Sequence, residues 1–362
     1  MTLADDTTSE VVKSYFRYSP YELSLMTLKQ RLSIYPWQTE LFSIGFILIY
    51  IGLFYYGSKY NEKLVNNVIN LNLNKFKENF YQVGCTKSKL VIKDDCENYT
   101  FYSTGRLNLK SMLIKFKLQA RQNFFIWLTE LVMSFFLETI AAPKDLINIE
   151  FEFNDDVKFD NFIWSIVTKD NMNQIRNENY YLSLTKITES SKLPIEYVFM
   201  NESPEMNELL YHKDLSELLI KCKSFLKILS ITDQPIEKPL ILNDLIPKKK
   251  LLLQLSIPKT PSDLESLNEL LSFILDEYID LISEKAIFRP ELLKKVKKTR
   301  DQEFAKLKKI ADDLLKEEIN QKKLEDAKKL RSSLNDEESK KLDKKQAERK
   351  QRRQMNKQKV RA

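Results

Sequence analysis

The sequence predicts an α+β globular domain that follows a single transmembrane helix and leads into a long C-terminal helical, coiled-coil tail. Residues 41–58 form a stretch of eighteen residues without a charge. The middle of the chain mixes strand-like and helix-like patterns. After Pro290 there is neither proline nor glycine for 72 residues. With 362 residues and 43% hydrophobic content, the chain is long and apolar enough to bury a core.

The N-terminal end is predicted to be a short segment outside the globular domain. It opens with "MTLADDTTSE", which is acidic and rich in hydroxyls, so we expect no cleavable signal peptide. The predicted organisation is a short lumenal segment over 1–36, a transmembrane helix over 37–58, a cytosolic α+β domain over 59–288, a helical coiled-coil arm over 289–338 and a basic helical tip over 339–362.

The uncharged stretch 41–58 predicts a membrane span. As a helix it would reach about 27 Å, close to a hydrocarbon core of about 30 Å. Trp37 precedes it and Tyr60 follows it, as expected for rings at the headgroup level. The alternative is a buried helix of a soluble domain. Gly45 and Gly52 are seven residues apart on one helical face, where they could admit a membrane partner, although the spacing can also be incidental.

Orientation follows from features other than flanking charge, because lysine and arginine are balanced on the two sides of the span. Asn98 and Asn201 begin glycosylation patterns that would be used only in a secretory lumen. Cys85, Cys96 and Cys222 fit no zinc spacing and are expected to be reduced thiols. These cysteines and the basic tail favour a cytosolic C-terminal domain.

The middle of the chain predicts the α+β domain. Alternation and β-branched or aromatic enrichment predict strands at 112–118, 147–153, 162–167, 181–187 and 251–257. Helical patterns lie at 122–139, 209–229 and 262–285. The last of these has a clear start, with Thr260 as N-cap and Pro261 at the first helical position.

A second strongly apolar run covers residues 124–136. Glu130 lies within it and Glu138 follows it, so we interpret the run as a core helix of the cytosolic domain. The alternative is an interfacial helix that lies on the bilayer. A single span is therefore predicted.

Motifs for catalysis are scarce. His212 is the single histidine, which excludes an HExxH metal site. The five glycines end at Gly105, so neither a phosphate-binding loop nor a dinucleotide-binding turn can be written after it. We expect no enzymatic activity, no cofactor and no metal site.

The tail carries the positive charge of the chain. Residues 291–362 contain 25 lysines and arginines against 14 acidic residues, while the whole chain has a net charge of +7. An apolar stripe from Phe304 to Leu315, at spacings of three and four residues, predicts packing on a partner helix. The final residues, 340–362, carry 11 basic and 2 acidic side chains.

Four interpretations compete for this basic tip. It is a solvated charge run, a patch for anionic lipid, a nuclear localisation signal or a contact for RNA phosphates, which bind closely spaced cations by counterion release. RNA binding is favoured, because the membrane span argues against nuclear import and the tip has no apolar face for lipid. The predicted contacts are Lys340, Lys341, Lys344, Lys345, Arg349, Lys350, Arg352, Arg353, Lys357, Lys359 and Arg361.

Three co-linear segments after the span carry a family resemblance. They are "FYSTGRLNLKSMLIKFKLQARQNFFIWL" (101–128), "TPSDLESLNELLSFILDEYIDLISEKAIFRPELLKKVKKTRDQEFAKL" (260–307) and "LNDEESKKLDKKQAERKQRRQMNKQKVRA" (334–362). Together they resemble the calumin family, the coiled-coil subunit of the PAT complex, the protein associated with the translocon. The likeness covers residues 41–362, although 169–247 match in pattern alone.

The resemblance implies a single-span endoplasmic reticulum protein with a cytosolic domain. Its partners would be the ribosome, through ribosomal RNA near the exit tunnel, a Sec61-type translocon and an Asterix-like small membrane protein. Together with the Asterix-like protein it would act as an intramembrane chaperone for nascent multipass membrane proteins. The acidic lumenal segment linked to calcium in animal members is absent, so calcium binding is not carried over. The alternative function is a membrane-anchored coiled-coil tether whose basic tip is only solubilising.

Overall fold

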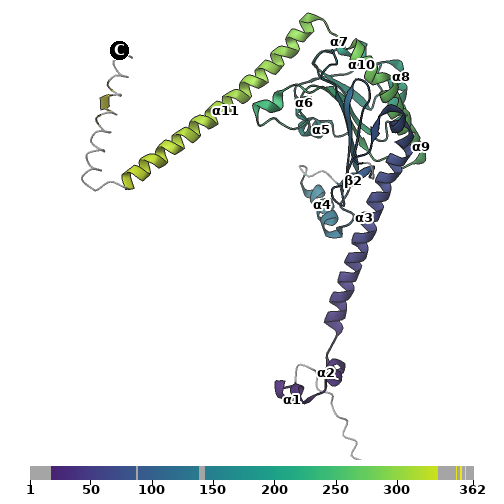
Figure 1. The fold of residues 1–362 in the computed structure, drawn as a ribbon, viewed down its shortest axis with the longest axis vertical. Helices are drawn as coiled ribbons and strands as arrows, with labels where there is room; N and C mark the ends of the chain where they lie inside the picture. Colours follow the sequence, from purple (N-terminus) through teal and green to yellow (C-terminus); the bar gives the residue numbers. More distant parts are fainter. Residues whose placement is uncertain are drawn as a thin grey trace, which may run out of the picture. The chain divides into compact units, whose positions relative to one another are not determined.

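The computed structural model describes residues 18–86, 89–137, 143–332, 348, 351–352 and 355 (Figure 1). The chain divides into two compact units. Unit 1 contains Met1–Arg106, Met112–Ile149 and Gln254–Asn268, and unit 2 contains Leu107–Ser111, Glu150–Leu253 and Glu269–Ala362.

The helices of the described residues are of very different lengths. They are α1 (Pro20–Leu25), α2 (Leu28–Ile34), α3 (Gln38–Asn79), α4 (Phe124–Phe136), α5 (Met172–Glu178), α6 (Tyr180–Ser183), α7 (Glu205–Leu210), α8 (Lys213–Lys221), α9 (Pro261–Phe273), α10 (Ile279–Lys285) and α11 (Pro290–Ser332), with a 3₁₀ turn η2 (Leu242–Leu245) and a π-helical segment η3 (Ile274–Tyr278).

Ten strands of the described residues form a mixed sheet-and-helix fold. They are β1 (Gln82–Val83), β2 (Val91–Lys93), β3 (Asn98–Thr104), β4 (Leu109–Lys117), β5 (Leu146–Phe153), β6 (Trp164–Thr168), β7 (Lys186–Thr188), β8 (Tyr197–Asn201), β9 (Leu226–Thr232) and β10 (Lys250–Ser256). Their hydrogen-bonded order is β1-β3-β4-β5-β10-β9-β6-β8-β7, and β2 pairs with β3. The predicted long apolar helix followed by a domain of sheet and helices is confirmed.

In unit 1, the second half of α3 packs on the sheet. Its buried residues recur at helical spacing, among them Val65, Ile69 and Phe76. The ring of Phe76 lies 5.2 Å from that of Phe101 on β3. Strand β3 alternates half-buried and buried residues and pairs antiparallel with β4, with Phe101 opposite Ile114. This alternation places one face of β3 against the helix.

In unit 2, β6 is a fully buried central strand. All five of its residues are buried, and it pairs antiparallel with both β8 and β9. The hydroxyls of Ser165 and Ser230, which face each other across β6 and β9, lie 2.6 Å apart, so the polar pair in this core is hydrogen-bonded. Trp164 is fully buried and donates from Nε1 to Asn207 Oδ1 at 2.8 Å.

Several predicted elements lie at their expected places. The strands at 112–118, 147–153, 162–167 and 251–257 correspond to β4, β5, β6 and β10. The helix at 262–285 is continuous from α9 through η3 to α10. Its predicted cap is confirmed, because Thr260 Oγ1 accepts from the Asp263 backbone N–H at 3.2 Å.

The strand predicted at 181–187 is largely wrong. Tyr181 and Leu182 are both buried, at 1% and 0% exposure, and they belong to the helical turn α6. The alternation expected of a half-exposed strand is missing here, and both side chains pack in the same hydrophobic core cluster. The strand at this place is the short β7, which pairs with β8.

The helix predicted at 209–229 is also wrong over much of its length. Helix α7 ends at Leu210, α8 covers Lys213–Lys221, and Leu226–Thr232 is the strand β9. Six of the seven β9 residues are buried. A short apolar run of a central strand cannot be told from a buried helix by periodicity alone, which explains the error.

Candidate functional site: the apolar segment of α3, its neighbour α4 and the arm α11

The first half of α3 is an exposed apolar surface. Among the described residues, α3 is the one helix long and apolar enough to cross a membrane. Of its most apolar 18-residue stretch, 11% is buried, and Phe42, Leu48 and Ile49 are 77%, 62% and 65% exposed. A core helix of a soluble domain would bury these side chains. The exposure therefore favours the predicted span over the soluble alternative.

Aromatic side chains lie at both ends of this apolar segment. The rings of Tyr35 and Trp37 meet edge to face at 5.0 Å before it. The rings of Tyr56 and Tyr60 stack at 6.4 Å at its other end. Amphipathic rings are enriched at the two interfaces of a bilayer. Their positions on the two sides of the apolar segment agree with a membrane span between them.

The glycines of α3 have different surroundings. A Cβ at Gly45 or Gly52 would have nothing within 4 Å, so the described residues leave open the face that is predicted to meet a membrane partner. A Cβ at Gly57 would lie 2.3 Å from the Arg121 carbonyl oxygen. Glycine at 57 thus permits a close approach of backbones that sequence reasoning missed.

Arg121 joins α3 to the loop before α4. Its Nη2 and Nη1 donate to the two carboxylate oxygens of Asp145 at 2.5 and 2.8 Å, and Nη1 also donates to Asn61 Oδ1 at 2.9 Å. The guanidinium lies 5.2 Å from the ring centre of Tyr60. A bidentate pair of this kind fixes geometry as well as charge. It holds residues 121 and 145 together at the side of α3.

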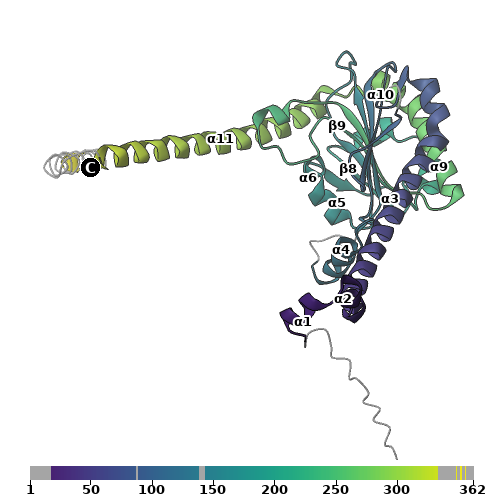
Figure 2. The ribbon, with the colours of Figure 1, turned by 60° about the horizontal axis from the view of Figure 1, so that its bottom comes forward.

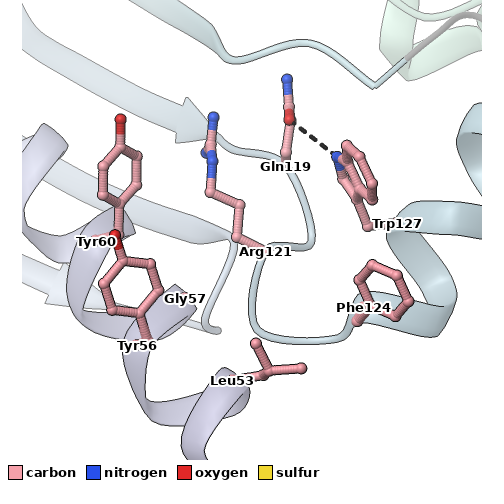
Figure 3. A pocket seen from close by; sticks show the side chains of 8 residues that line it. All are labelled: Leu53, Tyr56, Gly57, Tyr60, Gln119, Arg121, Phe124 and Trp127. Atoms are coloured by element: carbon pink, nitrogen blue, oxygen red, sulfur yellow. Dashed lines mark hydrogen bonds between the residues drawn. The ribbon is translucent and has the colours of Figure 1, made fainter. Parts of the chain in front are cut away.

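A pocket of about 380 Å³ lies between α3 and α4, and both helices belong to unit 1 (Figure 3). Its lining residues are Leu53, Tyr56, Gly57, Tyr60, Gln119, Arg121, Phe124 and Trp127. Trp127 donates from Nε1 to Gln119 Oε1 at 3.2 Å. Because Asp145 already neutralises Arg121, this largely aromatic lining suits an apolar group better than an anion.

Helix α4 is not the core helix that the sequence predicted. None of its residues is buried. Phe135 and Phe136 are 81% and 80% exposed. Its contacts are with the apolar part of α3, because the Phe125 ring lies 6.1 Å from that of Phe46 and 6.2 Å from that of Tyr50. Figures 1 and 2 show α4 beside α3.

Of the eleven predicted RNA-binding residues, Arg352 lies within the described part of the chain, where it is exposed in a helical stretch. The ten others, Lys340, Lys341, Lys344, Lys345, Arg349, Lys350, Arg353, Lys357, Lys359 and Arg361, are not described. RNA binding by these residues stays a prediction.

The N-terminal part of α11, which we call its root, is fixed to the rest of unit 2. Arg300 donates to both carboxylate oxygens of Glu202, at 2.7 and 3.1 Å, and to both of Asp233, at 3.0 and 2.7 Å. Burial lowers the pKa of Arg300, but its two carboxylates outweigh this and raise it. Tyr180 donates to Glu303 Oε2 at 3.0 Å. We call these contacts the arm clamp.

Beyond the arm clamp, α11 leaves the protein surface. Phe304, Ile310, Leu314 and Leu315 are 46%, 55%, 57% and 59% exposed. The helix predicted after Pro290 is confirmed as far as Ser332, where the continuous description ends. The predicted stripe is present on it, the described residues do not cover it, and its pairing in a coiled coil stays a prediction.

The model of the family described as PAT complex subunit CCDC47 matches residues 36–353. The chain belongs to this family. The match starts just before α3 and includes both units, so the predicted family is confirmed. The UPF0674 endoplasmic reticulum membrane protein YNR021W of Saccharomyces cerevisiae is 28% identical, with 80% of each chain covered. The UPF0674 endoplasmic reticulum membrane protein C2G5.01 of Schizosaccharomyces pombe is 26% identical, with 73% of each covered.

The names of these relatives agree with the geometry of α3. Both are endoplasmic reticulum membrane proteins, and this PAT complex subunit family member carries one candidate membrane span within its described residues. Membership also implies a translocon-associated complex.

Proposed function

We propose that this chain is a non-enzymatic factor for the biogenesis of multipass membrane proteins. It acts at a Sec61-type translocon in the endoplasmic reticulum, with its sheet domain and tail in the cytosol. Together with an Asterix-like small membrane protein it forms an intramembrane chaperone for nascent chains. Its basic tip docks to ribosomal RNA near the exit tunnel.

Membership in the PAT complex subunit family is the observation that carries this proposal. The architecture supports it in two ways. Helix α3 joins the apolar segment to the sheet domain without a break, so the domain is held at the membrane. Helix α11 has 43 residues and is about 65 Å long; it is clamped near its N-terminal end and leads toward the basic tip. A scaffold needs this combination of fixed root and long reach.

Ribosome binding is tested by co-sedimentation of the detergent-solubilised full-length chain with ribosomes at low and moderate salt. A truncation that ends at Ser339 is run beside it. We expect the parent to bind with steep salt sensitivity and the truncation to lose binding, because each phosphate contact releases condensed counterions. Equal binding by both proteins would refute the RNA-binding tip.

A matched pair of double variants separates ribosome binding by the tip from a general effect of positive charge. Arg352→Gln with Arg353→Gln removes two adjacent cations from the tip. Lys308→Gln with Lys309→Gln removes two exposed adjacent cations from α11. The tip variant should reduce the salt slope of binding by about 2, roughly one for each lost phosphate contact, and the α11 variant should leave it unchanged.

The exposed stripe of α11 favours a second candidate function, a membrane-anchored tether that binds proteins through a coiled coil. Its apolar side chains from Phe304 onward have the spacing of a helix seam. In this case the tip is only solubilising. Salt-resistant association that is lost on Leu314→Asp with Leu315→Asp, without ribosome binding, would identify the tether.

A further inference from the structure

Helix α4 presents an apolar surface that the described residues of the chain leave open. Six of its apolar side chains, Phe124, Phe125, Val132, Met133, Phe135 and Phe136, are between 41% and 81% exposed. Thr129, Glu130 and Ser134 are the polar residues of this 13-residue helix. A contiguous apolar surface of this kind marks a protein or membrane contact.

The contacts of α4 place it beside the membrane span at hydrocarbon depth. Phe125 packs against Phe46 and Tyr50, with ring centres 6.1 and 6.2 Å apart. Both partners lie inside the uncharged stretch 41–58. At 1.5 Å per residue, Tyr50 is about 12 Å and Phe46 about 18 Å from the Ser58 end of this stretch. A bilayer that covers the span therefore also covers Phe125.

Both ends of the segment around α4 return to one place. Before α4, Gln119 donates from Nε2 to the Pro143 carbonyl at 2.9 Å, and Arg121 pairs with Asp145. A helix of 13 residues is about 20 Å long, too short to cross a hydrocarbon core of about 30 Å. The segment thus begins and ends on the same side of the membrane.

The polar groups at the N-terminal end of α4 are placed for such an insertion. The N-terminal end of α4 is capped, because Asn123 Oδ1 accepts from the Ile126 backbone N–H at 3.3 Å. Trp127 donates to Gln119, and Tyr56 and Tyr60 line the same pocket from α3, on the side away from Trp127 (Figure 3). Rings with a polar atom are stable at headgroup level, while the helical backbone of α4 satisfies itself in lipid.

From this geometry we infer that α4 is a re-entrant membrane segment, with Phe135 and Phe136 in contact with phospholipid acyl chains. The occupant of its open surface is lipid, because that surface continues the apolar face of α3. The inference rests on the membrane span and is independent of ribosome binding and of the chaperone role. It gives the chain a second membrane contact beside its single span.

Tryptophan quenching by lipid tests this inference. In a W37F/W127F background the remaining Trp164 is fully buried in unit 2. F135W and F136W, made separately, each place one tryptophan on α4. I195W is the matched control, because Ile195 is an apolar residue of unit 2 that is 85% exposed. Each full-length protein is reconstituted in phosphatidylcholine vesicles with brominated acyl chains.

We expect the brominated lipid to remove most of the added emission of F135W and F136W and little of that of I195W, with the reverse order for the aqueous quencher acrylamide. Acrylamide quenching of all three would place α4 in water and overturn the inference. Protection of α4 from both quenchers would also overturn it and assign the surface to protein. An unchanged Trp164 emission in every variant shows that the sheet domain stays folded.

Discussion

Removal of Arg300 should release the root of α11 from unit 2. The side chains of Arg300, Glu202 and Asp233 are 15%, 7% and 1% exposed, and four hydrogen bonds join them. The Arg300→Ala variant leaves two carboxylates buried without their cation. Because these groups are shielded from water, solvent screening does not reduce the loss of stability.

The expected loss in the free energy of unfolding follows from the burial of these three side chains. Breaking a buried ion pair by removal of one partner costs about 3–5 kcal/mol. A domain of this size loses roughly 2–4 °C of melting temperature for each kcal/mol, so the midpoint should fall by roughly 6–20 °C. The assay is thermal unfolding at a fixed heating rate, followed through the fluorescence of Trp164, which lies next to Asn201 in the β6–β8 ladder.

The pH dependence has a definite sign. Burial raises the pKa of Glu202 even beside Arg300. A carboxyl with a raised folded pKa binds more protons in the folded state, so its contribution to stability falls as pH rises from the unfolded toward the folded pKa. Without Arg300 this pKa rises further. The difference in melting temperature between Arg300→Ala and the parent should therefore narrow as the pH is lowered from about 7 toward 5.

Two control variants make the reasoning refutable. Lys306→Ala removes a cation that is 70% exposed in its ion pair with Glu303, and it should cost less than about 1 kcal/mol. The uncharged set R300M with E202Q and D233N should recover much of the loss, because no buried charge stays unpaired. A midpoint for Arg300→Ala equal to that of Lys306→Ala, or no recovery by the uncharged set, would refute the clamp.

Two further predictions concern packing and orientation. Gly57→Ala places a Cβ 2.3 Å from the Arg121 carbonyl oxygen and should lower the stability measured by thermal unfolding by about 1–3 kcal/mol. Gly52→Ala places a Cβ in open space and should raise the stability by up to about 1 kcal/mol through helix propensity. Equal melting midpoints of the two variants would contradict the contact at Gly57. Asn201 is fully buried and donates to Asn207, so Asn98 is the acceptor to test: a cytosolic domain shows no endoglycosidase mobility shift, and a shift lost in the N98Q variant would reverse the orientation.

Much of the fold could be predicted from local patterns. The alternation in β5 and the cap at Thr260 each determine structure over a few residues, and both were found. The helix predicted at 209–229 wrongly includes the first four residues of β9, because the burial of this strand between two neighbouring strands depends on residues distant in sequence. Periodicity cannot carry that information.

The features of the candidate site also divide into those that local sequence properties predict and those that depend on residues distant in sequence. The span was readable because length and lack of charge are local properties. The exposure of α4 was not, since Glu130 suggested a soluble core and the contact of Phe125 with Phe46 joins segments 79 residues apart. The arm clamp was missed for the same reason, because Glu202, Asp233 and Arg300 have no shared motif. Gly57 offered one signal, a glycine just after the apolar stretch.

The unbroken course of α3 has a consequence for how the chain responds to its bilayer. A domain on a flexible linker is indifferent to the angle of its anchor, but here residues 38–79 are one helix whose far half packs on the sheet of unit 1. A short hydrophobic stretch adapts to a thicker membrane by thinning it locally or by standing more upright. Any change of tilt in the anchor then turns the attached sheet by the same angle. Membrane thickness thereby helps to set the orientation of the sheet of unit 1 relative to the bilayer.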